Sequence, residues 1–139
     1  MKFLDTNIIL RFLTRDDEQK AMACLALFQR VERGEEEVTL SEAILTEVCH
    51  ILSSSRHNYR LNREEIRARL LPLLSLRGLR LRDKRLYLRA LELYVQYPAL
   101  DIEDAISASR MQALGIKEIY SYDTDLDDIP NLTRLEPTE

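Results

Sequence analysis

The sequence is poor in the residues on which several common classes of protein depend. Its 139 residues include only 3 glycines, 2 cysteines and no tryptophan. The glycines, Gly34, Gly78 and Gly115, are too widely spaced to form a glycine-rich loop that cradles phosphate. The cysteines, Cys24 and Cys49, lie far apart among apolar neighbours. This spacing predicts two buried thiols rather than a disulfide framework or a cysteine metal site.

A long hydrophobic run is also missing. No apolar segment approaches the roughly 20 residues of a membrane-spanning helix. Asp5 places a carboxylate where a secretory signal would need its apolar core. We therefore expect a cytoplasmic protein without a membrane partner. The length, together with 45% hydrophobic and 32% charged residues, predicts a single globular domain over residues 1–139.

The net charge of −4 conceals a strong segregation of charge along the chain. Residues 56–89 contain 11 Lys and Arg against 3 Asp and Glu, a local +8, so the remainder sums to −12. This pattern suits an enzyme that holds a polyanion with one region and metal ions with another. The sequence leaves open the alternative that the basic residues are only the solvated faces of two helices.

Short apolar segments alternate with amphipathic ones. Strands are predicted at 3–4, 38–40, 79–81, 118–120 and 133–135, and helices at 8–13, 17–33, 62–74, 84–95 and 102–114. A further helix is predicted to follow Ser41, with its apolar face within 44–52, and a polar break is predicted at 53–58. Ser41 and Asn62 are predicted N-caps, and Gly34 and Gly115 are predicted stop signals. Alternating strands and helices imply parallel strands joined by crossovers. The predicted fold class is therefore α/β, a three-layer α/β/α sandwich with a short central, mostly parallel sheet.

Acidic residues are predicted at the ends of these strands. Asp5 ends the first strand and Asp123 follows strand 118–120, so both are expected on the rim of the sheet where ligands of α/β proteins bind. Glu47 falls at the border of the apolar face of its helix, and Asp104 falls in the first turn of helix 102–114. Carboxylates gathered without a counter-charge repel one another. Mg²⁺ relieves that repulsion and keeps positions for phosphate oxygens and an attacking water.

The acids also have structural interpretations, which the residues alone leave open. Asp5 could cap the helix that follows it. Asp104 could interact with the helix macrodipole, with Asp101 as the actual N-cap. The direction of Asp104 does not match the apolar face of its helix, which is formed by Ile102, Ala105, Ile106 and Ala113.

Several segments, in their order and spacing, resemble the PIN-domain family. They are residues 3–10, with Asp5-Thr6-Asn7, residues 40–48, the pair Asp104-Ala105, and residues 120–126. The tail, residues 129–137, is similar to those of the VapC-type toxins of that family. The resemblance spans essentially the whole chain, and its specificity lies in the ordered combination.

The resemblance implies an Mg²⁺- or Mn²⁺-dependent endoribonuclease that acts as the toxin of a toxin–antitoxin pair. The family's catalytic, metal-binding acids match Asp5, Glu47, Asp104 and Asp123. A further acid matches Asp125, and polar residues that hydrogen-bond around the metal match Thr6, Asn7 and Ser121. The resemblance also implies an RNA substrate, a homodimer and a small antitoxin that inserts a segment into the active-site groove.

Two other functions remain as alternatives. The first is a catalytically inactive module that binds RNA or a protein through the basic residues and keeps the acids for structure. The second is a phosphoryl-transfer or receiver-like domain, but Asn7 stands where a haloacid-dehalogenase-type site would need a second acid. His50, His57 and the serines at 53–55 lack any nucleophile–base arrangement, so structural roles are expected for them.

Overall fold

The computed structural model of the protein describes residues 1–54, 56 and 59–139. Part of the predicted polar break, Ser55, His57 and Asn58, lies outside the described residues. The described residues form two compact units, Met1–Lys84 and Arg85–Glu139. No described helix combines the length and the apolar character needed to cross a membrane.

Very short parallel strands organise the first unit. Strand β1 (Lys2–Phe3) pairs in parallel with β2 (Val38–Thr39), with Lys2 opposite Val38. The predicted strand at 79–81 is reduced to one parallel bridge between Val38 and Leu79. Because β2 has only two residues, it cannot form the run of backbone hydrogen bonds that a three-residue strand at 79–81 would need. The prediction of a full strand at 79–81 was therefore wrong, although the position of the pairing was right.

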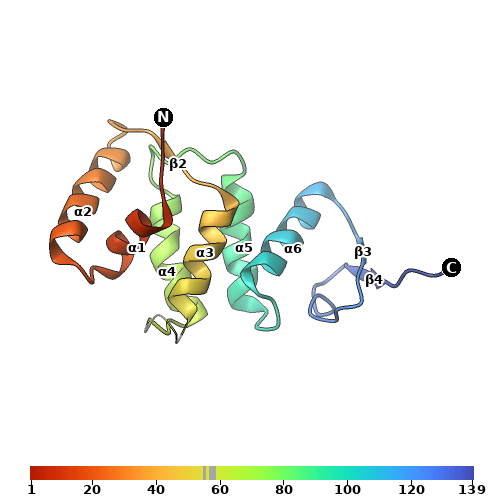
Figure 1. The fold of residues 1–139 in the computed structure, drawn as a ribbon. Helices are drawn as coiled ribbons and strands as arrows, with labels where there is room; N and C mark the ends of the chain where they lie inside the picture. Colours follow the sequence, from red (N-terminus) through yellow and green to blue (C-terminus); the bar gives the residue numbers. More distant parts are fainter. Residues whose placement is uncertain (55, 57–58) are drawn as a thin grey trace. The chain divides into compact units, whose positions relative to one another are not determined.

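Four helices complete the first unit: α1 (Thr6–Thr14), α2 (Glu18–Glu32), α3 (Glu42–Ser53) and α4 (Arg63–Leu74). Helix α1 packs against α2 and α3, and α3 packs against α4 (Figure 1). Ser41 caps α3 by accepting from the Ile44 amide, and Asn62 caps α4 within a capping box formed with Glu65. Both predicted N-caps are thus confirmed. Helix α1 begins at Thr6, two residues before its predicted start at Ile8.

Apolar residues from all four helices build the core of this unit. The rings of Phe12 and Phe28 pack with centroids 4.5 Å apart. The two cysteines are buried free thiols, as predicted, and burial raises the pKa of Cys24. The largest fully buried side chains of the unit include Phe28, Ile9, Leu52, Ile66, Leu70, Leu73, Leu74 and Leu79.

The second unit contains most of α5 (Lys84–Gln96), followed by α6 (Ile102–Leu114), β3 (Glu118–Tyr120) and β4 (Thr133–Leu135). Strands β3 and β4 pair in parallel, with Glu118 opposite Thr133. Helix α6 and both strands have the predicted bounds. Helix α6 ends at Gly115, whose left-handed φ of 70° suits glycine. Every pairing among the described strands is parallel, in agreement with the prediction of crossover connections.

Candidate active site

Asp5 lies between β1 and α1, at the N-cap position of the helix. Its backbone is extended, and its carbonyl accepts hydrogen bonds from the amides of Ile8 and Ile9 at 3.2 and 3.5 Å. Its exposed side chain makes no capping hydrogen bond. The structural interpretation of Asp5 therefore applies to its backbone only, and the carboxylate is left available for other chemistry.

Thr6 connects α1 to Glu47 on α3. The Thr6 hydroxyl donates a hydrogen bond of 2.7 Å to Oε2 of Glu47. Thr6 is buried, with 5% of its surface exposed, whereas Glu47 is exposed. The bond therefore fixes one oxygen of a carboxylate that solvent can still reach.

Asn7, predicted among the polar residues around the metal, faces a different hollow of the first unit. It lines this hollow with Arg11 and Lys20 and with Ile8, Ala23 and Cys24. Among the described residues its side chain makes no hydrogen bond with Asp5 or Glu47. Its predicted role in the site remains a prediction.

In the second unit, Asp101 caps α6 and Asp104 stands three residues further along. The side chain of Asp101 accepts a 2.8 Å hydrogen bond from the Asp104 amide. Asp101 is therefore the N-cap of α6, as the structural interpretation of the sequence proposed. Asp104 is half-buried, and its pKa is raised by burial first and then by the negative charges of Asp101 and Asp123.

The turn after β3 presents Asp123. The amide of Asp123 donates to the Ser121 hydroxyl at 3.0 Å, and Oδ1 of Asp123 accepts from the Asp125 amide at 3.0 Å. The pKa of Asp125 is raised, chiefly by the charge of Asp123, then by burial, with a contribution from Asp101. Ser121 and Asp125 therefore hold Asp123 in its turn. This turn and the start of α6 form one electrostatically coupled acidic group.

Arg134 on β4 supports this turn, a role that sequence analysis missed. Its guanidinium donates to the carbonyl of Ser121 at 3.3 Å, to Asp127 at 3.0 Å and to Glu136 at 2.8 Å. Its charge is directed to Asp127 and Glu136 rather than to Asp123. Strand 133–135 was predicted, but its sequence gave no indication of which loop its arginine would hold.

The predicted acids thus occur as two pairs, Asp5 and Glu47 in the first unit and Asp104 and Asp123 in the second. None of them forms an ion pair with a cation in the described part of the chain. No three histidine, cysteine or carboxylate side chains among the described residues stand together as a ready-made ion cage. The donor atoms are all oxygens, which fits a hard cation such as Mg²⁺ or Mn²⁺.

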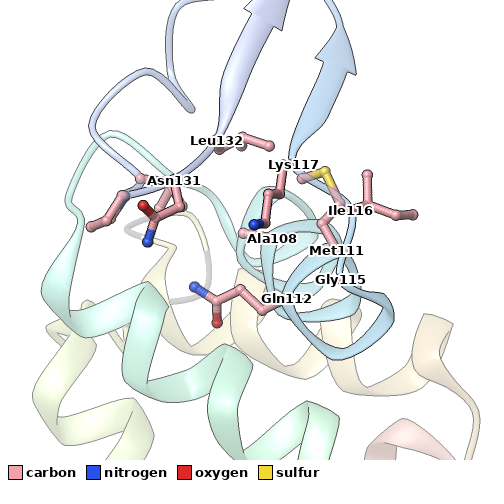
Figure 2. Close-up of a pocket in the computed structure, with 10 residues that line it drawn as sticks. Ala108, Met111, Gln112, Gly115, Ile116, Lys117, Asn131 and Leu132 are labelled. Carbon is pink, nitrogen blue, oxygen red and sulfur yellow. The ribbon is translucent and has the colours of Figure 1, made fainter.

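A cavity of about 200 Å³ in the second unit lies at the opposite end of α6 from Asp104 (Figure 2). None of the predicted site residues lines it. Figure 2 shows Lys117, Gln112 and Asn131 around it, among largely apolar neighbours. The acidic group of the second unit is therefore an open surface site rather than the floor of this cavity.

The chain is similar to known proteins over most of its length. The family model of the PIN domain matches residues 2–132, a range that contains all the predicted site residues. The VapC ribonuclease of Aquifex aeolicus (strain VF5) is similar to this chain, with 25% identity over 122 residues. The aligned part covers 88% of this chain and 87% of that relative.

Proposed function

This chain belongs to the PIN-domain family, and from that premise we propose that it is a metal-dependent endoribonuclease that hydrolyses RNA phosphodiester bonds. We further propose that it is the toxin of a type II toxin–antitoxin pair, which the name of its VapC relative supports. Family membership confirms the predicted fold class, an α/β sandwich of the PIN type. The family match over nearly the whole chain also supports one domain over residues 1–139.

The observation that carries the proposal is that the side chains of Asp5 and Asp104 do not cap the helices at whose starts they lie. Asp5 occupies a cap position without capping through its side chain. Asp104 stands beside a cap that Asp101 already supplies, and its pKa is raised by burial first and then by neighbouring negative charges. An arrangement of carboxylates that repel one another without a cation is unfavourable unless a ligand compensates for it.

We propose that Asp5, Glu47, Asp104 and Asp123 are the catalytic, metal-binding acids. When bound, Mg²⁺ or Mn²⁺ would activate the attacking water and stabilise the leaving oxygen. The chain's own residues keep the ligands in place. Thr6 holds Oε2 of Glu47, Ser121 and Asp125 hold Asp123, and Asp101 fixes the first turn of α6. Such supporting hydrogen bonds orient metal ligands in other proteins.

The proposal includes a cellular setting and partners. We propose that the protein acts in the cytoplasm as a homodimer and that a small antitoxin protein inhibits it. A basic side chain of such a partner could occupy the acidic site and exclude metal or substrate. Purification with and without a co-expressed antitoxin, followed by measurement of the mass of the complex, tests these partners.

The activity is tested by incubating purified protein with a broad RNA pool and Mg²⁺ or Mn²⁺. We expect cleavage that EDTA abolishes and that added metal restores. The Asp5→Asn variant should be inactive, whereas Asp128→Asn, which removes one exposed carboxylate outside the proposed ligand set, should remain active. Wild-type protein that cleaves nothing and behaves like Asp5→Asn would refute the proposal. RNA binding that survives EDTA without any cleavage would support an inactive binding module instead.

A further inference from the structure

The first unit carries an open, cationic hollow that is separate from its acidic pair. Its volume is about 440 Å³. It is lined by Arg77, Leu79, Arg80, Leu81, Arg82 and Lys84. We call it the arginine hollow. Its four cations are among the 11 Lys and Arg residues of the basic stretch 56–89.

The backbone of the arginine hollow is firmly held. The side chain of Leu79 is fully buried and its backbone forms the bridge to Val38. The Arg80 amide donates to the Val38 carbonyl at 2.8 Å, and the Arg80 carbonyl accepts from the Thr39 hydroxyl at 2.6 Å. Because side chains alternate along an extended segment, burial of Leu79 directs Arg80 outward, and Arg80 is exposed.

Gly78 makes this arrangement possible. Its amide donates to the Val31 carbonyl and its carbonyl accepts from the Val38 amide, each at 2.9 Å. A Cβ atom at this position would lie 2.3 Å from the Glu36 carbonyl oxygen and 2.6 Å from that of Val31. The segment therefore lies directly on the backbone of its neighbours. The cations next to it project from a rigid support.

The four cations of the arginine hollow differ in whether they already bind other groups of the protein. Lys84 donates to the carbonyls of Leu79 and Leu76 at 2.6 and 3.4 Å, and Arg80 pairs with Glu37 at 3.2 Å. Two exposed guanidiniums remain without an ion pair or a side-chain hydrogen bond in the described part of the chain. They belong to Arg77 and Arg82.

Positive charge therefore predominates in the hollow. Three carboxylates lie near its four cations: Glu37, which pairs with Arg80, Glu32, which lines a neighbouring hollow with Arg77, and Asp83, which is adjacent in sequence and has interactions of its own. These three acids do not fully offset the four positive charges, and neither Arg77 nor Arg82 forms an ion pair with them in the described part of the chain. An anion that enters the hollow can therefore bind Arg77 and Arg82 without breaking an ion pair within the described part of the chain.

We propose that the arginine hollow binds the phosphate backbone of the RNA substrate, with Arg77 and Arg82 contacting phosphate oxygens. This inference rests on the proposed nuclease function. The acids of the active site repel the RNA backbone, so attraction for it must come from elsewhere in the chain. A guanidinium presents a planar fork of donors that matches phosphate. The lining lacks the aromatic anchors that are typical of protein interfaces, which favours RNA over an acidic protein.

The test separates binding from cleavage by using the Asp5→Asn background. Affinity for a short random-sequence single-stranded RNA is measured over a series of salt concentrations. Adding Arg77→Ala and Arg82→Ala should weaken binding about tenfold. It should also reduce the slope of log K against log salt by about 1.4, because each phosphate contact contributes about 0.7 for a single strand. Thermal unfolding confirms that each variant is folded.

A matched control removes two other guanidiniums from the same basic stretch. Arg56→Ala with Arg60→Asn makes the same change in net charge outside the arginine hollow, and asparagine tolerates the left-handed backbone of Arg60, whose φ is 49°. This control should bind RNA more tightly than the Arg77/Arg82 variant does. Equal affinities and salt slopes for the two double variants would overturn the proposal. Displacement of RNA by poly-glutamate as efficiently as by RNA itself would overturn it too.

Kinetics of the otherwise wild-type enzyme distinguish failure of this inference from failure of the proposed function. Arg77→Ala with Arg82→Ala should raise KM about tenfold and leave kcat nearly unchanged, as expected for loss of uniform binding. Normal cleavage with an unchanged KM would refute RNA binding by the arginine hollow but would leave the nuclease proposal intact. If the protein never cleaves RNA but binds it in a way that depends on Arg77 and Arg82, the nuclease proposal is refuted and RNA binding by the arginine hollow is supported.

Discussion

The Thr6 hydroxyl and Oε2 of Glu47 lie 2.7 Å apart, although 41 residues separate them in the sequence. The donor is buried and the acceptor is exposed. A buried hydroxyl therefore orients Glu47, one of the proposed metal ligands. This relationship allows the orientation of a ligand to be changed without removing the ligand itself.

We expect Thr6→Val to lower ribonuclease activity about 10- to 100-fold while the protein remains folded. The substitution removes the hydroxyl that holds Glu47 but nearly conserves the buried volume, and losses of this size are typical when a residue that supports a metal ligand is changed. The measurement is cleavage rate as a function of metal concentration, in which the metal requirement should shift to higher concentrations.

Thr14→Val provides the matched control on the same helix. The Thr14 hydroxyl donates to the Leu10 carbonyl, and the Thr14 side chain also interacts with Asp16 and Tyr59. None of these residues belongs to the proposed site, so the loss of the hydroxyl should leave the metal dependence unchanged. Identical metal titrations for the two variants would show that the Thr6–Glu47 bond does not orient a ligand.

Substitution of Asp101 should lower mainly the stability of the protein, whereas substitution of Asp104 should lower mainly its activity. Asp101→Ala removes the cap of α6 and should cost about 1 kcal/mol of unfolding free energy. Asp104→Asn leaves that cap intact and removes a charge that its neighbours oppose, so it should not destabilise the protein in EDTA but should abolish cleavage. Urea unfolding and RNA cleavage measure the two effects. A loss of stability in Asp104→Asn equal to that in Asp101→Ala would contradict this division of roles.

The bond between Tyr59 and Asp16 should make part of the stability depend on pH. The Tyr59 hydroxyl donates to Asp16 at 2.8 Å, and this bond, together with Arg11, holds the pKa of Asp16 below its ordinary value of 3.8. The folded protein thus binds fewer protons at Asp16 than the unfolded chain does. The stabilisation is present above pH 3.8 and is lost as the pH falls through the lower folded-state value.

We expect Tyr59→Phe to cost about 0.5 to 1 kcal/mol at neutral pH, a modest value because the pair is partly exposed. The difference from wild type should shrink as the pH falls below 3.8. Tyr120→Phe, which changes a tyrosine that is 71% exposed, should have no effect at either pH. Thermal melts of the three proteins at both pH values provide the comparison. A destabilisation by Tyr59→Phe that persists undiminished in acid would argue against a contribution from the Asp16 charge.

Gly78→Ala should destabilise the protein more than Gly115→Ala does. At Gly78 the added methyl would overlap two backbone oxygens that cannot easily move, and overpacking of this kind costs about 3 kcal/mol. At Gly115 the methyl meets open space, and only the left-handed φ of 70° opposes it, at about 1 kcal/mol. Denaturant unfolding of both variants gives the comparison. Equal losses would mean that the close approach at Gly78 can relax.

Elements with local signals at both ends could be predicted from the sequence. Helix α6 has its N-cap at Asp101 and its left-handed stop at Gly115, and its predicted bounds are confirmed. The start of α1 was misplaced because the apolar periodicity begins at Ile8, whereas Thr6 is buried and bonded to α3. The alternation Leu79-Arg80-Leu81 indicates a strand, but the length of that strand was limited by β2, which has only two residues.

The same distinction applies to the candidate site. The candidate acids were predicted from ordered motifs, each of which is local in sequence, and their role in the site stays a prediction. The partner of Thr6 could not be identified, nor could the support that Arg134 gives to the Ser121 turn, because both depend on tertiary contacts. Asp101 was recognised as a cap. Its charge also raises the pKa of Asp104 and Asp125, which follows only from the way the turn and the helix start come together.

Because the cap of α6 is supplied by Asp101 and the side chain of Asp5 caps nothing, we expect that replacing both Asp5 and Asp104 by asparagine costs little folding stability. A host cell could then accumulate large amounts of an intact but harmless protein. Such material would permit crystals with uncut RNA, and it would allow a search for the proposed antitoxin in cells that the proposed toxin activity would otherwise kill.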